Sequence, residues 1–321
     1  MKAAVVRAVG QPPRYGEFAD PVPLPGETEV FVTATAVSRL VRGRAAGTHY
    51  SAGAAPPFVP GIDGTGRTSE GRRVFFSFPR APFGSMAERS VVPDKYLVPL
   101  PEGLDDAVAA AAANPGMSCW IPFTRLARIQ NGESVLVNGA TGIAGQMAVQ
   151  VAKHLGASKV VGTGRDATKL RALSELGADV TISLLDPPET LRSAVRREAK
   201  DDAIGVVLDY LWGPPAETIL SALGGPNAPR GASRVRFVHV GSLAGNTISL
   251  DGSILRSSGI EVLGTGLGSS TDQDLLDGIG EFLRALASAR FRIPIELCPL
   301  SDVDQAWTQS TGEKRLVFTI P

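Results

Sequence analysis

The sequence predicts an α/β protein in which a β-rich part accompanies a doubly wound parallel sheet. Two observations carry this prediction. Residues 1 to about 100 contain short apolar or alternating runs separated by Pro- and Gly-rich turns, which is the pattern of a compact barrel or sandwich. From residue 134 onward, apolar runs alternate with helical segments, which is typical of βαβ units and of a parallel sheet.

Each expected element follows from its local pattern. In the β-rich part, β-branched and aromatic residues cluster at 29–37, 72–78 and 87–93, and we expect strands there. The stretch LDDAVAAAAANPGMSCWIPFTRLA predicts a helix, a break at Asn114-Pro115-Gly116 and a second helix. Apolar runs then predict parallel strands at 134–138, 159–163, 179–182, 205–210, 234–240 and 260–266.

The end of the chain is expected to return to the first domain. After the last parallel strand, an amphipathic helix is predicted by apolar residues at 275, 276, 279, 282, 283 and 286. The tail that follows has the pattern strand, helix, strand. We therefore predict a first domain at 1–113, a dinucleotide-binding domain at 114–270 and a return to the first domain at 271–321.

Composition and charge argue against several classes of protein. The 321 residues contain 32 Lys and Arg against 32 Asp and Glu, so no basic surface for nucleic acid is implied. The opening MKAAVVRAVG holds an apolar run too short for a signal-peptide core. No apolar stretch approaches the roughly 20 residues of a membrane span. We expect a cytoplasmic protein.

Cysteine and histidine are too sparse for a structural zinc site. The cysteines are Cys119 and Cys298, and the histidines are His49, His154 and His239. A structural zinc ion usually takes four ligands, commonly with thiolates spaced C-x₂₋₄-C, and the chain has no such pair. A catalytic zinc ion held by scattered residues stays open as an alternative at this point.

The stretch VNGATGIAGQMAVQVAKHLGA, residues 137–157, carries the signal for a bound nucleotide. A buried strand leads into the glycine turn Gly139–Gly145, and an amphipathic helix follows at 143–155. Glycines let the backbone approach a pyrophosphate closely, and the helix N-terminus offers unpaired N–H groups. The alternative is a tight packing turn, but a strand before it, a helix after it and a further strand beyond favour the nucleotide.

The end of the second parallel strand indicates which dinucleotide binds. An NAD enzyme places an acidic residue there, whereas this chain has Gly164 followed by Arg165. A small residue beside a guanidinium leaves room for a 2′-phosphate and supplies a cation to bind it. Lys169 could add a second charge, and Asp166 is expected to cap the next helix. The sequence favours NADPH over NADH, with a solvated surface charge as the alternative role of Arg165.

Two families open a nucleotide site with a similar turn. GATGIAG looks like the start of atypical short-chain dehydrogenases, which often carry a Tyr-x-x-x-Lys pair, but none of the four tyrosines here has a Lys four residues on. The whole chain instead resembles the zinc-independent quinone oxidoreductase branch of the medium-chain dehydrogenase/reductase family. The resemblance rests on the order and spacing of MKAAVVRAVG, LPGETEVFV, PFVPGIDGTG, GSMAERSVVPDKYLVPLPEGL, GESVLVNGATGIAGQMAVQVAKHLGA and GEKRLVFTIP.

This resemblance implies a fold and the absence of a metal ion. The family fold is a GroES-like β domain, a Rossmann domain inserted within it and a C-terminal return to the first domain. Zinc members hold their ion with a Cys, a Gly-His-Glu segment and a further Cys. At the first two of these places this chain has Ser38 and Gly61-Ile62-Asp63, so no metal is expected.

The resemblance also assigns the cofactor contacts. The pyrophosphate is expected on backbone N–H groups of the glycine turn, and a small hydroxyl residue and two later loops are expected along the nicotinamide half. The residues expected to bind NADPH are Ser118, Ala140, Thr141, Gly142, Ile143, Ala144, Gly164, Arg165, Lys169, Gly241, Ser242, Gly264, Thr265, Gly266 and Arg315.

The implied reaction is hydride transfer from NADPH to a small molecule, either a quinone or an activated carbonyl or enone compound. The substrate side departs from the family, because the usual Asn, acidic residue and Tyr of one loop are Ser38, Val41 and Gly43 here. His49 and Tyr50 are then the nearby side chains able to donate a proton, with ordered solvent as the alternative.

Two other functions fit the same sequence, an NADPH-binding module with little or no turnover and a dedicated enoyl reductase. The resemblance further predicts a homodimer. Family members often pair through the last Rossmann strand, and the apolar edge at 260–265 would otherwise be exposed.

Overall fold

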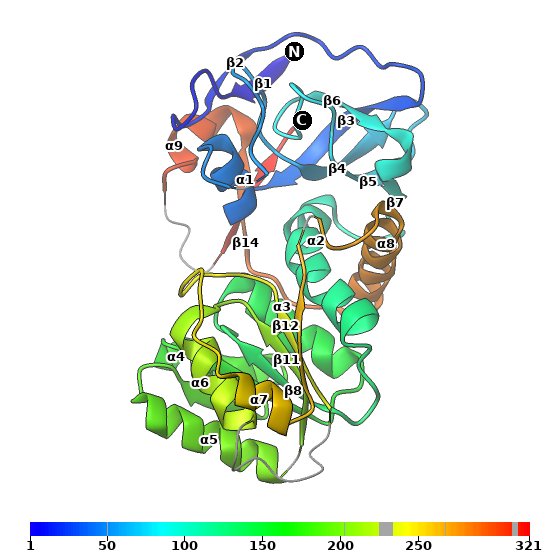
Figure 1. Ribbon diagram of the computed structural model, residues 1–321. Helices are drawn as coiled ribbons and strands as arrows, with labels where there is room; N and C mark the ends of the chain where they lie inside the picture. The colour runs from blue at the N-terminus through cyan, green and yellow to red at the C-terminus, as the bar shows by residue number, and fades with distance from the viewer. Residues whose placement is uncertain (50, 202, 225–233, 267, 310–313) are drawn as a thin grey trace. The chain divides into compact units, whose positions relative to one another are not determined.

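Figure 1 shows the computed structural model, which describes residues 1–49, 51–201, 203–224, 234–266, 268–309 and 314–321. The chain divides into two compact units. Unit 1 consists of Met1–Asn114 and Ile279–Pro321, and unit 2 consists of Pro115–Gly278. The second division falls inside α8 (Asp272–Ala289), eight residues later than the expected one.

Unit 2 is built on a six-stranded parallel sheet with the strand order β10-β9-β8-β11-β12-β13. Counted along the chain, this is the order 3-2-1-4-5-6 of a Rossmann fold, so the predicted doubly wound sheet is confirmed. In such a sheet the ligand crevice lies where the order reverses, at the carboxyl ends of β8 and β11. The strands are β8 (Ser134–Asn138), β9 (Lys159–Gly164), β10 (Val180–Ser183), β11 (Ile204–Asp209), β12 (Val235–His239) and β13 (Ile260–Gly264).

The strands of unit 2 form because nearly continuous apolar runs can bury both faces of a parallel sheet. Leu136, Val161, Val207 and Phe237 are fully buried in its core. The helices that follow the strands in the chain are α3 (Ile143–His154), α4 (Ala167–Ala172), α5 (Pro188–Asp201), α6 (Gly213–Leu223) and α7 (Gly252–Ser257).

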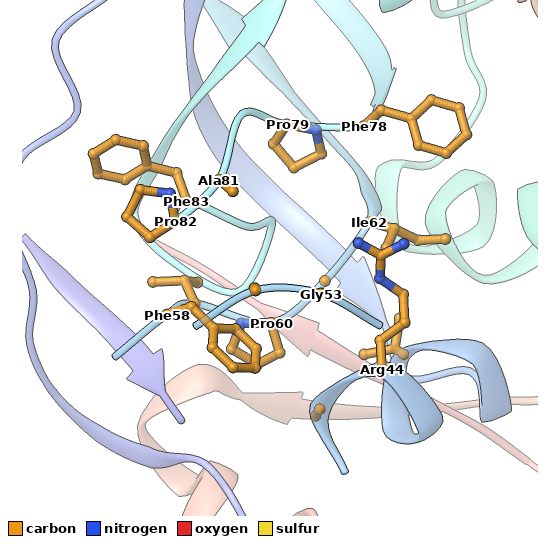
Figure 2. A pocket seen from close by; sticks show the side chains of 15 residues that line it. Arg44, Gly53, Phe58, Pro60, Ile62, Phe78, Pro79, Ala81, Pro82 and Phe83 are labelled. Atoms are coloured by element: carbon orange, nitrogen blue, oxygen red, sulfur yellow. The ribbon is translucent and has the colours of Figure 1, made fainter. Parts of the chain in front are cut away.

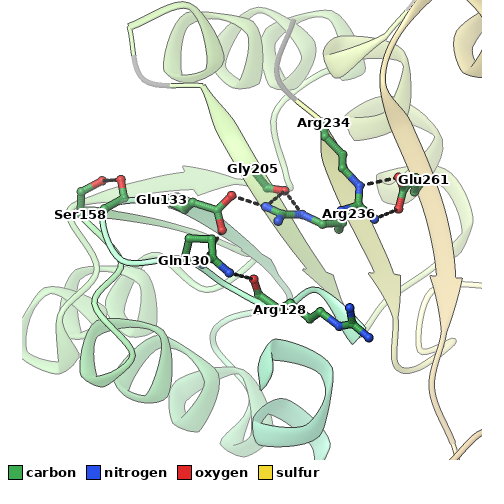
Figure 3. Close-up of polar contacts among 9 residues, drawn as sticks. Arg128, Gln130, Glu133, Ser158, Gly205, Arg234, Arg236 and Glu261 are labelled. Carbon is green, nitrogen blue, oxygen red and sulfur yellow. Dashed lines mark hydrogen bonds and ion pairs between the residues drawn. The ribbon is translucent and has the colours of Figure 1, made fainter. Parts of the chain in front are cut away.

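The amino ends of these strands are joined by ion pairs, as Figure 3 shows. The guanidinium of the buried Arg236 donates to the Gly205 carbonyl, with Nε at 3.1 Å, and pairs with Glu133. Arg234 forms a two-pronged pair with Glu261, with Nη2 and Oε2 2.6 Å apart. These contacts hold neighbouring strands together at the edge opposite to the ligand crevice.

Unit 1 contains a mixed sheet with the strand order β14-β15-β3-β4-β5-β7, and β6 also pairs with β3. The C-terminal strand β15 pairs antiparallel with β3, so the end of the chain joins the N-terminal sheet of the GroES-like domain. A separate pair, β1 and β2, completes the strands. The bounds are β1 (Lys2–Val5), β2 (Arg14–Glu17), β3 (Glu27–Ala36), β4 (Asp63–Thr68), β5 (Arg73–Ser77), β6 (Arg89–Pro93), β7 (Leu97–Pro99), β14 (Ile295–Pro299) and β15 (Arg315–Thr319).

The expected break at Asn114-Pro115-Gly116 is wrong, because α2 (Asp106–Ile121) is one continuous helix. Pro115 lacks the N–H of a helical bond, which costs roughly 3 kcal/mol inside a helix. Burial on both sides offsets this cost. Ala113 and Cys119 are fully buried and Trp120 is 7% exposed, and burying one large apolar side chain is worth about 1.5–3 kcal/mol. None of the helices in the described ranges is both long and apolar enough to cross a bilayer.

Candidate active site

Two glycines shape the turn between β8 and α3, which we call the cradle (residues 139–145). Gly139 has a φ of 88°, a conformation that residues with a side chain rarely adopt. A Cβ on Gly145 would stand 2.3 Å from the Gly139 carbonyl oxygen, so only a glycine lets the first turn of α3 pack directly on the turn. The two glycines therefore bring the N-terminus of α3 to the carboxyl end of β8.

Backbone N–H groups of the cradle are left without an acceptor. Within the described part of the chain, the N–H groups of Thr141, Ile143 and Ala144 make no hydrogen bond, and that of Gly142 lies 3.4 Å from the Gly139 oxygen. The expectation for Ala140 has to be corrected, because its N–H donates to the Thr163 carbonyl at 2.8 Å. Unpaired donors at a helix N-terminus bind phosphate groups well, since the helix dipole adds to their attraction.

A buried polar network beneath the cradle was not expected from the sequence. The Gly139 N–H donates to Thr163 Oγ1 at 3.1 Å, and this hydroxyl donates to Asn138 Oδ1 at 2.6 Å. The Asn138 amide in turn donates to Asp209 Oδ1 at 2.7 Å. All three side chains are fully buried, so the network holds the first residue of the cradle in place. Its signal in the sequence is a polar residue at or next to the carboxyl end of each of β8, β9 and β11.

The end of β9 lies against the cradle. A Cβ on Gly164 would stand 2.3 Å from the Thr141 Cγ2, so a side chain there would collide with the turn. Arg165 follows at once, is exposed and makes no ion pair with any residue that the structure describes. The neighbouring Asp166 is the N-cap of α4, as expected, and accepts from the N–H groups of Thr168 and Lys169. These hydrogen bonds, the one from Lys169 above all, lower the pKa of Asp166.

The loops after β12 and β13 lie at the same edge of the sheet. The Gly241 N–H donates to the Asp209 carbonyl at 3.2 Å, and a Cβ on Gly241 would be 3.1 Å from the backbone carbonyl oxygen of Tyr210. Ser242 Oγ lies 3.4 Å from His239 Nε2. At the end of β13, a Cβ on Gly264 would meet no atom within 4 Å. The Thr265 N–H donates to the His239 carbonyl, and the Gly266 N–H donates to Ser269 Oγ.

Ser118 is linked to the carboxyl edge of the sheet through Tyr210. Its hydroxyl donates to the Pro115 carbonyl at 2.7 Å and lies 3.2 Å from the Tyr210 hydroxyl, and Tyr210 directly follows β11. Burial raises the pKa of Tyr210 and that of the adjacent Cys119 thiol, so both groups stay protonated at neutral pH. Neither can therefore act as a nucleophile there.

In unit 1, His49 is held by its neighbours in the loop after α1 (Arg39–Ala45). The Ser51 N–H donates to His49 Nδ1 at 3.2 Å, and Ser51 Oγ lies 2.8 Å from the same atom. Arg44 Nη1 donates to that Oγ at 3.1 Å. Burial, and then the charge of Arg44, lowers the pKa of His49, so a neutral ring with its proton on Nε2 dominates at neutral pH. Tyr50 lies outside the described residues.

Figure 2 shows a pocket that is lined in part by Arg44 and Gly53, and the sequence did not predict it. Its cavity volume is about 120 Å³, below the roughly 300–1,000 Å³ of most small-molecule pockets, and part of it is open to solvent. Its signal in the sequence is the pair of Pro- and Phe-rich segments PPFVPGI and FPRAPF. The lining residues are Val41, Arg44, Ala45, Gly53, Ala54, Phe58, Val59, Pro60, Gly61, Ile62, Phe78, Pro79, Ala81, Pro82 and Phe83.

The residues at the places of the zinc ligands do not fit a zinc ion. Ser38 Oγ accepts from the Val41 N–H at 3.0 Å as the N-cap of α1. Ile62 offers no donor atom, and zinc prefers thiolate and imidazole ligands. Within the part of the chain that the structure describes, no three His, Cys, Asp or Glu side chains gather closely enough to hold a metal ion.

Arg315, expected near the cofactor, starts β15 in unit 1 and is 9% exposed. Its Nε is buried and has no acceptor among the described residues. The carboxylate of Asp63 attracts the Arg315 guanidinium electrostatically, although no hydrogen bond joins the two. Burial lowers the pKa of Arg315 to about 10 and raises that of Asp63 to about 6. A buried guanidinium with a free N–H could accept an anionic ligand.

Comparison with known proteins finds relatives along the whole chain. The sequence pattern of zinc-binding dehydrogenases matches residues 144–279. The chain is 30% identical over 363 aligned residues to the probable NADPH-dependent quinone reductase tdiC of Emericella nidulans, with 100% of both proteins covered. It is 28% identical to prostaglandin reductase-3 of Mus musculus, over 70% of this chain and 58% of that protein. The quinone oxidoreductase of Thermus thermophilus, also solved in complex with NADPH, superposes over 100% of both chains with a TM-score of 0.79 and 27% identity.

Proposed function

This chain belongs to the quinone-reductase-like branch of the medium-chain dehydrogenase/reductase family, and from that membership we propose that it is an NADPH-dependent oxidoreductase. Its acceptor is a quinone or an activated carbonyl or enone compound. The names of its relatives support both acceptor classes, since one is a probable quinone reductase and another is a prostaglandin reductase. No metal ion takes part, because Ser38 and Ile62 occupy the ligand places.

The observation that carries this proposal is the row of unpaired donors in the cradle, with Arg165 next to it. The N–H groups of Thr141, Ile143 and Ala144 bind the pyrophosphate. Arg165 has no carboxylate partner among the described residues and is free to bind the 2′-phosphate, with Lys169 one turn further on. Gly164 leaves the space that an acidic side chain would fill in an NAD enzyme.

The other expected cofactor residues bind the nicotinamide half. Gly241, Ser242 and residues 264–266 lie at the carboxyl edge of the sheet, where a dinucleotide extends across a Rossmann fold. Ser118 lies on α2 and contacts Tyr210 at the same edge. Arg315 completes the proposed set of cofactor residues as a positive charge, since its Nε is buried. Bound NADPH would supply a hydride from its nicotinamide, so the chain needs no redox group of its own.

The residues of unit 1 position the acceptor and exclude water. The apolar pocket removes a quinone or enone from solvent, and well-oriented reactants can lower a barrier by roughly 7–11 kcal/mol. His49 is neutral and carries its proton on Nε2, so it donates a hydrogen bond to the oxygen that becomes negative, or orders the water that supplies the proton. Tyr50 is the second proposed donor.

A rate assay tests the proposal. NADPH oxidation is followed by its near-ultraviolet absorbance with quinones, enals, enones and nitroarenes as acceptors, and the same set is repeated with NADH. Turnover with NADPH that far exceeds turnover with NADH supports the proposal. Tight NADPH binding without turnover of any acceptor would instead indicate a nucleotide-binding module, and strict preference for thioester enones would indicate a dedicated enoyl reductase.

We also propose that two copies pair through β13. This strand lies at the end of the six-stranded sheet, so one side of its backbone has no neighbouring strand in the described sheet. Val262 on this strand is 38% exposed. An exposed apolar edge strand is a natural place for a second copy to pair.

A further inference from the structure

The pocket of unit 1 is apolar except for one cation. Of the described residues that line it, Arg44 is the only one with a charged side chain, and all the others are Gly, Ala, Val, Ile, Pro or Phe. In Figure 2 the Arg44 side chain extends from α1 toward Ile62. A quinone without charged substituents needs no such group in its binding site.

Arg44 has no anionic partner among the described residues. No carboxylate of theirs lies within 4.0 Å of its guanidinium, and Nη1, which donates to Ser51, is its only N–H group with a hydrogen bond to them. Burial lowers the pKa of Arg44, yet an arginine remains charged at neutral pH. A half-buried charge without an opposite charge beside it is unfavourable, so an anion that binds at Arg44 would stabilise it.

Three other arginines of unit 1 have ordinary partners. Arg80 pairs with Glu27 at 2.7 Å, and Arg73 pairs with Asp106. Arg42, on the same helix as Arg44, lies over the Trp307 ring at 5.7 Å. Arg44 therefore differs from these three in lining an apolar pocket with guanidinium N–H groups that have no acceptor among the described residues.

We propose that the pocket binds an acceptor with an apolar body and a carboxylate, and that Arg44 binds the carboxylate. The free N–H groups of a guanidinium match the two oxygens of a carboxylate, and the low polarity of the walls strengthens that contact. This inference rests on the proposed reductase function and names the class of its acceptor.

A matched pair of acceptors tests the inference. 3-Benzoylacrylate is an enone that carries a carboxylate, and its methyl ester keeps the enone but not the charge. The value of kcat/KM for each is measured with NADPH in the native chain, in Arg44→Gln and Arg44→Lys, and in Arg42→Gln as a control that removes a charge from the same helix. We expect the carboxylate-to-ester ratio to fall about tenfold or more in Arg44→Gln, to fall less in Arg44→Lys and to stay within about twofold in Arg42→Gln.

A binding measurement separates failure of this inference from failure of the proposed function. 3-Benzoylpropionate and its methyl ester cannot be reduced in this way, and their affinities are measured by calorimetry in the presence of NADP⁺. Tighter binding of the carboxylate in the native chain, lost in Arg44→Gln, supports the inference even if no acceptor is turned over. A carboxylate-to-ester ratio of affinities that is the same in the native chain and in Arg44→Gln overturns it, even if the enzyme reduces both 3-benzoylacrylate and its methyl ester. Should Arg44→Gln fail to fold, equal affinity of the native chain for acid and ester overturns it as well.

Discussion

Gly164 lies so close to Thr141 that a Cβ on Gly164 would stand 2.3 Å from the Thr141 Cγ2 and 2.9 Å from its Oγ1. We expect Gly164→Ala to lower the free energy of unfolding by about 1–3 kcal/mol, because the end of β9 or the cradle must shift. The shift moves the free Thr141 N–H, so NADPH affinity falls too. Urea unfolding and NADPH titration measure the two effects.

Gly142→Ala is the matched control within the cradle. Gly142 has a φ of −80°, and a Cβ there would meet no atom nearer than the Gly139 oxygen at 3.8 Å. Alanine should therefore change the free energy of unfolding by less than about 0.5 kcal/mol. A loss of stability as large as that of Gly164→Ala would contradict the proposed collision.

Replacement of Arg165 distinguishes the two nicotinamide cofactors. We expect Arg165→Ala to reduce the thermal shift caused by NADPH but not that caused by NADH, because only NADPH carries a 2′-phosphate. The lost contact corresponds to about 1–3 kcal/mol of binding free energy. Arg171→Ala is the control, since Arg171 is an exposed arginine of α4 that donates to Thr168. Equal loss with both cofactors would show that Arg165 does not read the 2′-phosphate.

The charge of Arg44 is expected to tune His49. Burial, and after it this charge, disfavours the imidazolium and lowers the pKa of His49. Arg44→Gln should therefore raise that pKa toward the ordinary value of 6.5. Arg42→Gln should raise it less, because Arg42 is not among the causes of the lowered pKa. NMR titration of the ring protons measures this, with His154 and His239 as internal references. A pKa of His49 that does not rise in Arg44→Gln would contradict the effect of the Arg44 charge on this ring.

Asp63 should make stability depend on pH. Burial raises its pKa from 3.8 to about 6 in the folded chain, so the folded state binds this proton more tightly than the unfolded state. The free energy of unfolding therefore falls as the pH rises from about 4 to about 6, by about 3 kcal/mol for this group. Above that range its contribution no longer changes.

Asp63→Asn removes this group, so the variant should lose that part of the pH dependence. Arg315 stays charged between pH 4 and pH 7 because its pKa is about 10, and its attraction to ionised Asp63 is already included in the Asp63 pKa of about 6. The loss of this attraction in Asp63→Asn therefore adds no further slope to that of the lost titration. Urea unfolding at several pH values gives the slope of the free energy of unfolding against pH for the native chain and for Asp63→Asn. Asp186 is exposed, so Asp186→Asn is the control. An unchanged slope in Asp63→Asn would rule out the raised pKa.

The proposed dimer can be tested at one exposed residue of β13. Val262→Lys places a charge on the edge strand and should shift the sedimenting species from dimer to monomer at micromolar concentration. Leu255 lies in α7 and is 41% exposed, close to the 38% of Val262, so Leu255→Lys controls for the loss of an exposed apolar side chain. A native chain that sediments as a monomer at every concentration would refute the proposal.

Some features of this protein depend on residues close together in the chain, and these could be predicted. The glycine turn after an apolar strand indicated the cradle, and Asp166 was recognised as a helix cap, because both depend on backbone conformation over a few residues. Pro115 shows the limit of such reasoning. Its local preference is to end a helix, and burial of the residues on either side overrides it.

Contacts between distant segments could not be predicted in the same way. Ala140 has the same place in the motif as its neighbours, and only the pairing with Thr163 shows that its N–H is not available to a phosphate. The network of Asn138, Thr163 and Asp209 joins three strands, and the pocket of Arg44 joins segments around residues 44, 58 and 80. Each of these segments has a recognisable pattern, but that pattern does not show which other segments it meets.

By itself the sequence determined the class of fold, the place of the cradle and the preference for a phosphorylated dinucleotide, because periodicity, glycine turns and the residue after a strand are local properties of the chain. Only the tertiary structure decided which N–H groups remain unpaired, that His49 is neutral beside Arg44, and that a cation without a carboxylate partner among the described residues stands in an apolar pocket. The physical reason is that hydrogen-bond satisfaction, burial and the field of a charge depend on which distant side chains meet.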